Sequence, residues 1–166
     1  MAKMLLVGLG ANLPDAYGRP ALSTCEWAVR QVAGLPGLEL EAVSRWYQTA
    51  PVPRSEQPDY INGVVRLSGA ASPETVLGQL HGIEARAGRV RGEPNAARVL
   101  DLDLLAVDDL IRPGPGLILP HPRLAERAFV LWPLCDVAPG WRHPGLGLTA
   151  LELRDAADRR GVAVLE

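Results

Sequence analysis

The segment Leu100-Asp101-Leu102-Asp103-Leu104 is the pattern in this chain most able to do chemistry. In a β-strand, side chains alternate between two faces, so the leucines would share one face and the two aspartates the other. The Cα atoms of Asp101 and Asp103 would then lie about 6.6 Å apart. Their carboxylates could converge on two divalent cations about 3.5–4 Å apart, as in two-metal phosphoryl chemistry. A solvated face of a half-buried strand shows the same alternation, so neighbouring residues must distinguish the two interpretations.

Four arginines directly precede the aspartates: Arg86, Arg89, Arg91 and Arg98. Guanidinium groups match the oxygens of phosphate, so this cluster could form a cationic wall beside carboxylate-bound metal ions. A solvated helix end would also favour such cations. Lys3 is the only lysine among the 17 basic residues, so a bound phosphate would be held by arginine. Beside the two aspartates, the cluster favours a magnesium–nucleotide site.

Three further side chains are candidates for the same site. Glu84 could hold an arginine or a nucleotide hydroxyl, or be an ordinary surface glutamate. His121 lies between two prolines, and a neutral imidazole there could donate a hydrogen bond to a phosphate, although a lone histidine in a turn often has no function. Phe129, the only phenylalanine, follows Arg127 and could contact a ligand rather than the core.

Two common phosphate-binding loops are excluded. Gly8-Leu9-Gly10 would need its third glycine at Leu13 to be a dinucleotide fingerprint, and no acidic residue with a βαβ context follows. The chain also has no GxxxxGK[ST] segment, which excludes a P-loop.

Length and composition predict one domain over residues 1–166. A formal charge of −2 and 5% aromatic residues argue against a nucleic-acid partner. No apolar run approaches twenty residues and none resembles a signal-peptide core, so we expect a soluble, cytoplasmic protein without a membrane partner. Cys25 and Cys135 fit no metal-ligand spacing and are expected to be reduced thiols.

Periodicity predicts strands over residues 4–10, 38–47, 60–67 and 98–107, and helices over 21–32, 73–87, 125–134 and 148–160. Ser72 would cap the second helix and Pro73 would begin it. Residues 48–58 should form a loop that shapes a pocket. The order β-α-β-β-α-β predicts an α+β fold, a ferredoxin-like antiparallel sheet with helices packed on one face. The opposite face, carrying Asp101 and Asp103, would stay open.

Six blocks in order carry a resemblance to a known family. They are Tyr47–Pro51, Gln57–Asn62, Gly88–Arg91, Arg98–Asp103, Pro120–Pro122 and Phe129–Leu134. Each block is short, but their joint order and spacing are specific. Together they resemble the 6-hydroxymethyl-7,8-dihydropterin pyrophosphokinases of folate biosynthesis.

The resemblance implies a ferredoxin-like fold and transfer of the pyrophosphoryl group of ATP to the pterin hydroxymethyl, with release of AMP. Two Mg²⁺ ions would be held by Asp101 and Asp103, with ATP as co-substrate. The protein is expected to be a monomer. The implied site falls into three groups: a catalytic set of Asp101, Asp103, Arg89 and Arg98; a nucleotide set of Glu84, Arg91, His121 and Arg127; and a pterin set of Tyr60 and Phe129 as stacking rings with Asn62, Thr49 and Val52 at the polar edge.

The chain departs from the family between Arg91 and Arg98. The family has Arg-Trp-Gly-Pro there, whereas this chain has Glu93–Ala97 and is one residue shorter. How this loop closes over substrates is therefore left open. One rival hypothesis is a non-catalytic ferredoxin-like ligand-binding or regulatory domain with an acidic sheet face. Another is a nucleotidyltransferase, although no Gly-Ser phosphate loop precedes the aspartates.

Overall fold

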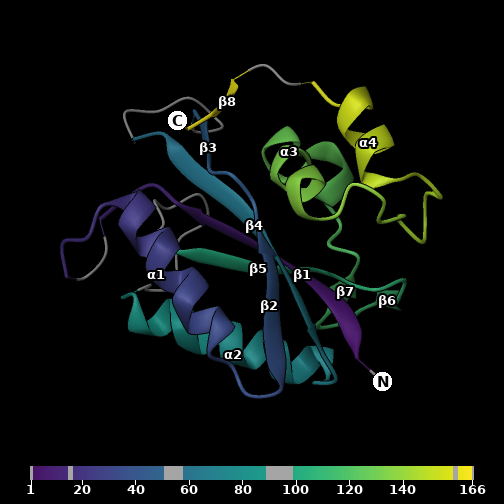
Figure 1. The fold of residues 1–166 in the computed structure, drawn as a ribbon, viewed down its shortest axis with the longest axis horizontal. Helices are drawn as coiled ribbons and strands as arrows, with labels where there is room; N and C mark the ends of the chain where they lie inside the picture. Colours follow the sequence, from purple (N-terminus) through teal and green to yellow (C-terminus); the bar gives the residue numbers. More distant parts are fainter. Residues whose placement is uncertain (1, 15–16, 51–57, 89–98, 159–160, 166) are drawn as a thin grey trace.

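The computed structural model describes residues 2–14, 17–50, 58–88, 99–158 and 161–165. Its centre is an antiparallel sheet of six strands (Figure 1). The strand order is β5-β1-β4-β3-β8, and β2 also pairs with β4. The bounds are β1 (Lys3–Ala11), β2 (Leu38–Val43), β3 (Tyr47–Thr49), β4 (Tyr60–Gly69), β5 (Asp101–Val107) and β8 (Val162–Val164). A separate two-stranded ribbon is formed by β6 (Arg112–Pro113) and β7 (Ile118–Leu119).

One face of the sheet is covered by α1 (Ala21–Ala33) and α2 (Pro73–Arg86), which lie beside each other in Figure 1. The core on this side consists of branched residues of β1, β4 and β5 against apolar stripes of the two helices. The predicted start of α2 is confirmed, because the Ser72 side chain accepts a hydrogen bond from the backbone N–H of Thr75 and Pro73 follows it. The α+β antiparallel architecture predicted from the sequence is therefore confirmed.

The other face is only partly open, which differs from the expectation that all helices pack on one side. A 3₁₀ turn (Leu124–Glu126), α3 (Ala128–Val137) and α4 (Ala150–Ala156) pack there. They bury a second core that includes Leu6 and Val64 of the sheet. The reason is the composition of α3, since a helix that is apolar nearly all round must be covered. Only the part of this face near the start of β5 is left for a site.

Two element boundaries also differ from the prediction. The expected strand 38–47 is divided into β2 and β3, because Ser44 bonds back to Val64 through both its N–H and its hydroxyl. The expected helix 148–160 ends at Ala156, and β8 follows and pairs with β3. Within the described residues, no helix is both long and apolar enough to cross a membrane.

Candidate active site

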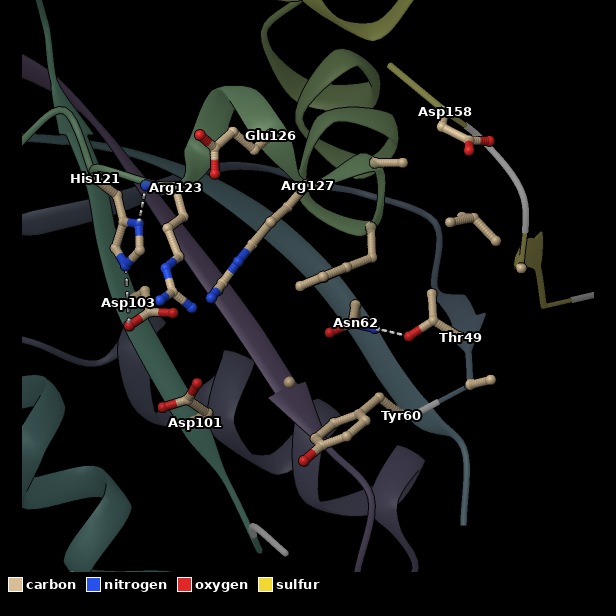
Figure 2. A pocket seen from close by; sticks show the side chains of 16 residues that line it. Thr49, Tyr60, Asn62, Asp101, Asp103, His121, Arg123, Glu126, Arg127 and Asp158 are labelled. Carbon is tan, nitrogen blue, oxygen red and sulfur yellow. Dashed lines mark hydrogen bonds and ion pairs between the residues drawn. The ribbon is translucent and has the colours of Figure 1, made fainter. Parts of the chain in front are cut away.

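Asp101 and Asp103 lie on β5 and line a cavity of about 1000 Å³ on the partly open face (Figure 2). Leu102 and Leu104 alternate with them and are buried on the α1/α2 face, each 3% exposed. The strand therefore separates apolar from acidic side chains, as a period of two requires. The side chain of Asp103 is 37% exposed, so its carboxylate is accessible from the cavity.

Two glycines of β1 lie beside the aspartates in the sheet. Gly10 is in register with Asp101, and Gly8 with Asp103. A Cβ atom at Gly10 would come within 3.0 Å of Asn62 Oδ1, and one at Gly8 within 3.4 Å of Leu105 Cδ1. Gly10 thus keeps the floor of the cavity free of a side chain. The sequence interpretation, which tested these glycines only as a dinucleotide fingerprint, missed this role; their alternation in step with the aspartates was the available signal.

His121 faces Asp103 from the turn that follows β7. Its Nε2 lies 4.0 Å from Asp103 Oδ1, and its Nδ1 accepts a hydrogen bond from the backbone N–H of Arg123 at 3.2 Å (Figure 2). The neutral ring therefore carries its proton on Nε2. Burial lowers the pKa of His121, Arg127 and Arg123 lower it further, and Asp101 opposes them. The imidazole is thus a neutral donor aimed at the carboxylate end of the cavity.

Arg123 and Arg127 extend from the segment before α3 into the same end of the cavity (Figure 2). The Arg127 guanidinium also lies over the ring of Phe129, 5.4 Å from its centroid. Arg127 was predicted in the site, whereas Arg123 was missed, although it directly follows the Pro120-His121-Pro122 turn. The cavity therefore brings guanidinium groups and the two carboxylates to the same end.

The opposite end of the cavity is lined by polar side chains of β3 and β4, with Asp158 on its C-terminal wall. Asn62 on β4 donates from Nδ2 to Thr49 Oγ1 on β3 at 3.1 Å, and both residues are buried (Figure 2). Tyr60 and Phe129 also line the cavity. A buried amide whose nitrogen is already committed presents its oxygen in a fixed direction. This end is suited to a flat heterocycle with hydrogen-bonding edges.

Glu84 does not line the cavity. It is 2% exposed on α2, and its Oε2 accepts a hydrogen bond from the backbone N–H of Leu102 at 2.8 Å. Because β5 is at the edge of the sheet, this carboxylate satisfies a donor that has no neighbouring strand. Glu84 therefore supports the strand of the aspartates from the α2 side, which differs from the expected position at the nucleotide.

Four predicted site residues, Arg89, Arg91, Arg98 and Val52, lie outside the described residues. Conversely, the C-terminal segment contributes Asp158, Gly161 and Val162 to the cavity wall, and Glu126 also lines it. Sequence reasoning missed Asp158, Gly161 and Val162 because it extended a helix over the C-terminal segment and did not predict β8.

The carboxylate pair fits Mg²⁺ in its chemistry. Mg²⁺ prefers oxygen ligands and is usually bound by one or two carboxylates together with substrate phosphates and water. In the part of the chain that the structure describes, no group of three or more His, Cys, Asp or Glu side chains could hold a metal ion by itself. Asp101 and Asp103 therefore suit an ion whose remaining ligands arrive with a phosphorylated substrate.

Comparison with known proteins places the chain in a family. A family model described as 7,8-dihydro-6-hydroxymethylpterin-pyrophosphokinase matches residues 6–139. The chain belongs to this family. A Synechocystis protein named 2-amino-4-hydroxy-6-hydroxymethyldihydropteridine pyrophosphokinase is 39% identical over 92% of this chain and 75% of its own length. A Pseudomonas aeruginosa protein of the same name is 38% identical over 87% and 86%. The family predicted from the six blocks is confirmed, and with it the prediction of a pterin pyrophosphokinase enzyme rather than a non-catalytic domain.

Solved structures agree on the fold. The Plasmodium falciparum HPPK-DHPS structure with pteroate matches with a TM-score of 0.69, at 12% identity, over 93% of this chain and 42% of that one. A second structure of that protein, with pterin and p-hydroxybenzoate, matches with a TM-score of 0.67 at 13% identity, over 93% and 42%. At such identities the likeness concerns the fold alone, and it confirms the predicted ferredoxin-like family fold.

Proposed function

We propose that this enzyme transfers the pyrophosphoryl group of ATP to the hydroxymethyl of 6-hydroxymethyl-7,8-dihydropterin and releases AMP, a step of folate biosynthesis. The observation that carries the proposal is a row of three residues across the sheet: Asn62, Gly10 and Asp101 are in register on β4, β1 and β5. Adjacent strands lie about 4.8 Å apart, so the row spans about 9.6 Å. That length suits a bicyclic pterin with its polar edge at Asn62 and its hydroxymethyl directed toward the aspartates.

The pterin lies at the end of the cavity that Asn62 and Thr49 line. Tyr60 and Phe129 stack on the ring, and Asn62 Oδ1 accepts from its donor-rich edge, with backbone groups of Thr49 and Val52 completing the recognition. The amide orientation is supported by its bond to the Thr49 hydroxyl. Gly10 leaves the ring free to lie flat on β1 between the two ends.

The triphosphate lies at the other end, beside the two aspartates and the arginines. His121 and Arg127 contact it, and we add Arg123 from its position in the cavity. Arg89, Arg91 and Arg98 complete the cationic set. The hydroxymethyl oxygen attacks the β-phosphorus, the bond from that phosphorus to the α-phosphate oxygen breaks, AMP leaves and the hydroxyl proton is released. The chain contributes mainly positioning and neutralisation of the developing negative charge.

Asp101 and Asp103 would hold two Mg²⁺ ions. Bound there, the ions would neutralise the phosphate oxygens and align the nucleophile with the β-phosphorus. Two carboxylates supply few ligands, so we expect metal affinity to depend strongly on the bound nucleotide. Glu84 assists by holding the N–H of Leu102, between the two aspartates.

Incubation of the protein with ATP, Mg²⁺ and the reduced pterin tests the proposal, with the nucleotides resolved by chromatography. We expect one AMP for each pterin consumed, and no AMP when the pterin is omitted. Formation of ADP would indicate transfer of a single phosphoryl group, and formation of free pyrophosphate with a nucleotidylated product would favour the nucleotidyltransferase. Either result would overturn the proposal. The predicted monomeric state and the single domain over residues 1–166 stay predictions.

A further inference from the structure

A hydrogen-bond network joins α3 to β3 at some distance from the cavity, and its central bond, between Tyr47 and Asp136, is partly buried. The hydroxyl of Tyr47 donates to Asp136 Oδ2 at 2.9 Å, and the backbone N–H of Arg45 donates to the same oxygen at 3.1 Å. The Arg45 side chain also donates to both carboxylate oxygens, from Nε at 3.3 Å and from Nη2 at 3.0 Å. Among the residues that the structure describes, the donors to the Asp136 carboxylate thus come from Arg45 and Tyr47, just before and in β3.

Both partners are aligned with residues of the acceptor end, which is the end of the cavity that Thr49, Tyr60, Asn62 and Phe129 line. Tyr47 is two residues before Thr49 on β3, so the two side chains share one face, and Tyr47 is in register with Asn62 on β4. Asp136 follows Phe129 by seven residues, which is two helical turns, so these side chains lie on one side of α3 about 10.5 Å apart. The hydrogen-bond network lies near the C-terminal end of α3, and the cavity lies at the N-terminal end of the same helix.

The C-terminal end of α3 is also fixed to β4. Arg66 Nη1 donates to the backbone carbonyl of Val137 at 2.5 Å, beside Asp136. The first turn of α3, with Ala128 and Phe129, borders the cavity instead. The anchored end and the turn that borders the cavity thus belong to the same helix.

The bond between Tyr47 and Asp136 is the most shielded one of the network. Tyr47 is 1% exposed and the Asp136 side chain 16%, whereas the Arg45 side chain is 63% exposed. An exposed ion pair contributes little, but a buried hydrogen bond to a charged group contributes more. Burial, followed by the adjacent Asp136, raises the pKa of Tyr47 to about 12, so the phenol remains a donor at neutral pH.

A sandwiched ring is sensitive to small movements of α3. Two carbon contacts of about 3.5–4 Å each define the gap between the stacking rings, and an extra 0.5–1 Å forfeits roughly a quarter to a half of the dispersion attraction. We propose that Tyr47 and Asp136 are positioning residues that set the width of the acceptor end through α3, and so determine affinity for a thin planar acceptor. This inference rests on the proposed function, since it assumes that the pterin lies between Tyr60 and Phe129.

Steady-state kinetics of Tyr47→Phe provide the first test, because this change removes only the hydroxyl. We expect the KM for the pterin to rise about tenfold, the KM for ATP to stay within about twofold, and kcat to change little. Asp136→Asn should lie between wild type and Tyr47→Phe, because its amide oxygen can still accept from Tyr47. Asp155→Asn, on the neighbouring helix α4, is the matched control and should leave both KM values unchanged, since its pair with Arg154 is exposed.

Fluorine NMR tests the geometry without any substrate. Because Phe129 is the only phenylalanine, incorporation of para-fluorophenylalanine gives one resonance that reports on the acceptor end. Asp136→Leu should shift or broaden this resonance, and Asp155→Asn should not. A lower melting temperature in Tyr47→Phe and Asp136→Leu, with the pterin KM and the resonance unchanged, would show a merely structural network and overturn the inference. If the wild type formed no AMP, the proposed function would fail and the resonance alone would decide the inference.

Discussion

The two faces of the sheet use the same strands for different purposes. On the α1/α2 face, β1 and β5 present leucine and valine side chains that are almost completely buried. On the other face, the neighbouring residues of the same strands are Gly10, Asp101 and Asp103, which line the cavity. Alternate side chains of one strand can thus contribute to the core on one face and to the site on the other.

The boundary between site and second core lies at a single irregularity. The pairing of β1 with β5 shifts register between Leu6 and Val7, and Leu105 and Ala106 both pack into the α3 core. Such a bulge places two successive side chains on one face. Beyond it the strand is covered by α3, and before it the aspartates are open to the cavity. The comparison shows that both the position of a residue along β5 and the face it occupies determine whether its side chain packs in a core or lines the cavity.

Removal of a carboxylate from the open face should have the largest effect. We expect Asp101→Asn or Asp103→Asn to lower turnover at least about 100- to 1000-fold, because each removes a negative charge from the proposed metal site. The melting temperature should change little. Glu39→Gln, an exposed acid on β2, is the control and should retain full turnover. Near-normal turnover of either aspartate variant at saturating Mg²⁺ would break the division between the faces.

Truncation of the leucine between the aspartates should have the opposite signature. Leu102→Ala leaves a cavity in the α1/α2 core and should cost about 2–5 kcal/mol in the free energy of unfolding. The folded fraction should keep kcat within a fewfold of wild type. Urea unfolding together with active-site-normalised turnover checks both expectations. A loss of turnover as deep as in Asp103→Asn, with stability unchanged, would contradict the account.

Asn62 sharpens the comparison within the open face. We expect Asn62→Ala to weaken pterin binding by roughly 1–3 kcal/mol, because a polar edge of the ligand is left unpaired, while ATP binding stays unchanged. Phe129→Ala should also weaken pterin binding through lost ring contact. Calorimetry with each ligand separates the two ends of the cavity. Unchanged pterin affinity in both variants would place the pterin elsewhere.

The smallest effect is expected from His143, in the loop before α4 and away from the cavity. Its Nδ1 accepts two backbone N–H bonds, from Gly145 at 3.0 Å and Leu146 at 3.1 Å, and burial lowers its pKa. Since the unfolded chain binds the proton more readily, stability should fall as pH decreases below about 6.5, the ordinary pKa. Melting temperatures at pH 7.5 and 5.5 should therefore differ less in His143→Asn than in wild type. An equal difference in both would exclude this contribution.

Much of the fold could be predicted because its signals are local. The Ser72 cap, the proline at the start of α2 and the alternation of β5 each follow from a few neighbouring residues. The break between β2 and β3 could not be predicted, because it depends on Ser44 bonding to Val64 twenty residues away. The strand β8 was missed for a similar reason, since its three residues are stabilised mainly by pairing with β3.

The candidate site divides in the same way. Sequence reasoning selected Asp101, Asp103 and His121, whose chemistry is visible in the residue types. The structure brings these three together around one cavity with Asn62 and Tyr60. Sequence reasoning could not have shown that Glu84 bonds to the edge of β5, because that contact depends on how α2 lies under the sheet. Gly10 was missed since its contribution is the absence of a side chain.

The binding stoichiometry of a paramagnetic divalent ion tests the central claim most directly. Mn²⁺ can replace Mg²⁺ at oxygen sites, so its titration into the protein with a non-hydrolysable ATP analogue can be followed by electron paramagnetic resonance. The account predicts two bound ions per chain with the analogue, much weaker binding without it, and loss of at least one ion in Asp101→Asn and in Asp103→Asn. Two tightly bound ions in the variant that carries both substitutions would contradict the claim that these carboxylates hold the metal.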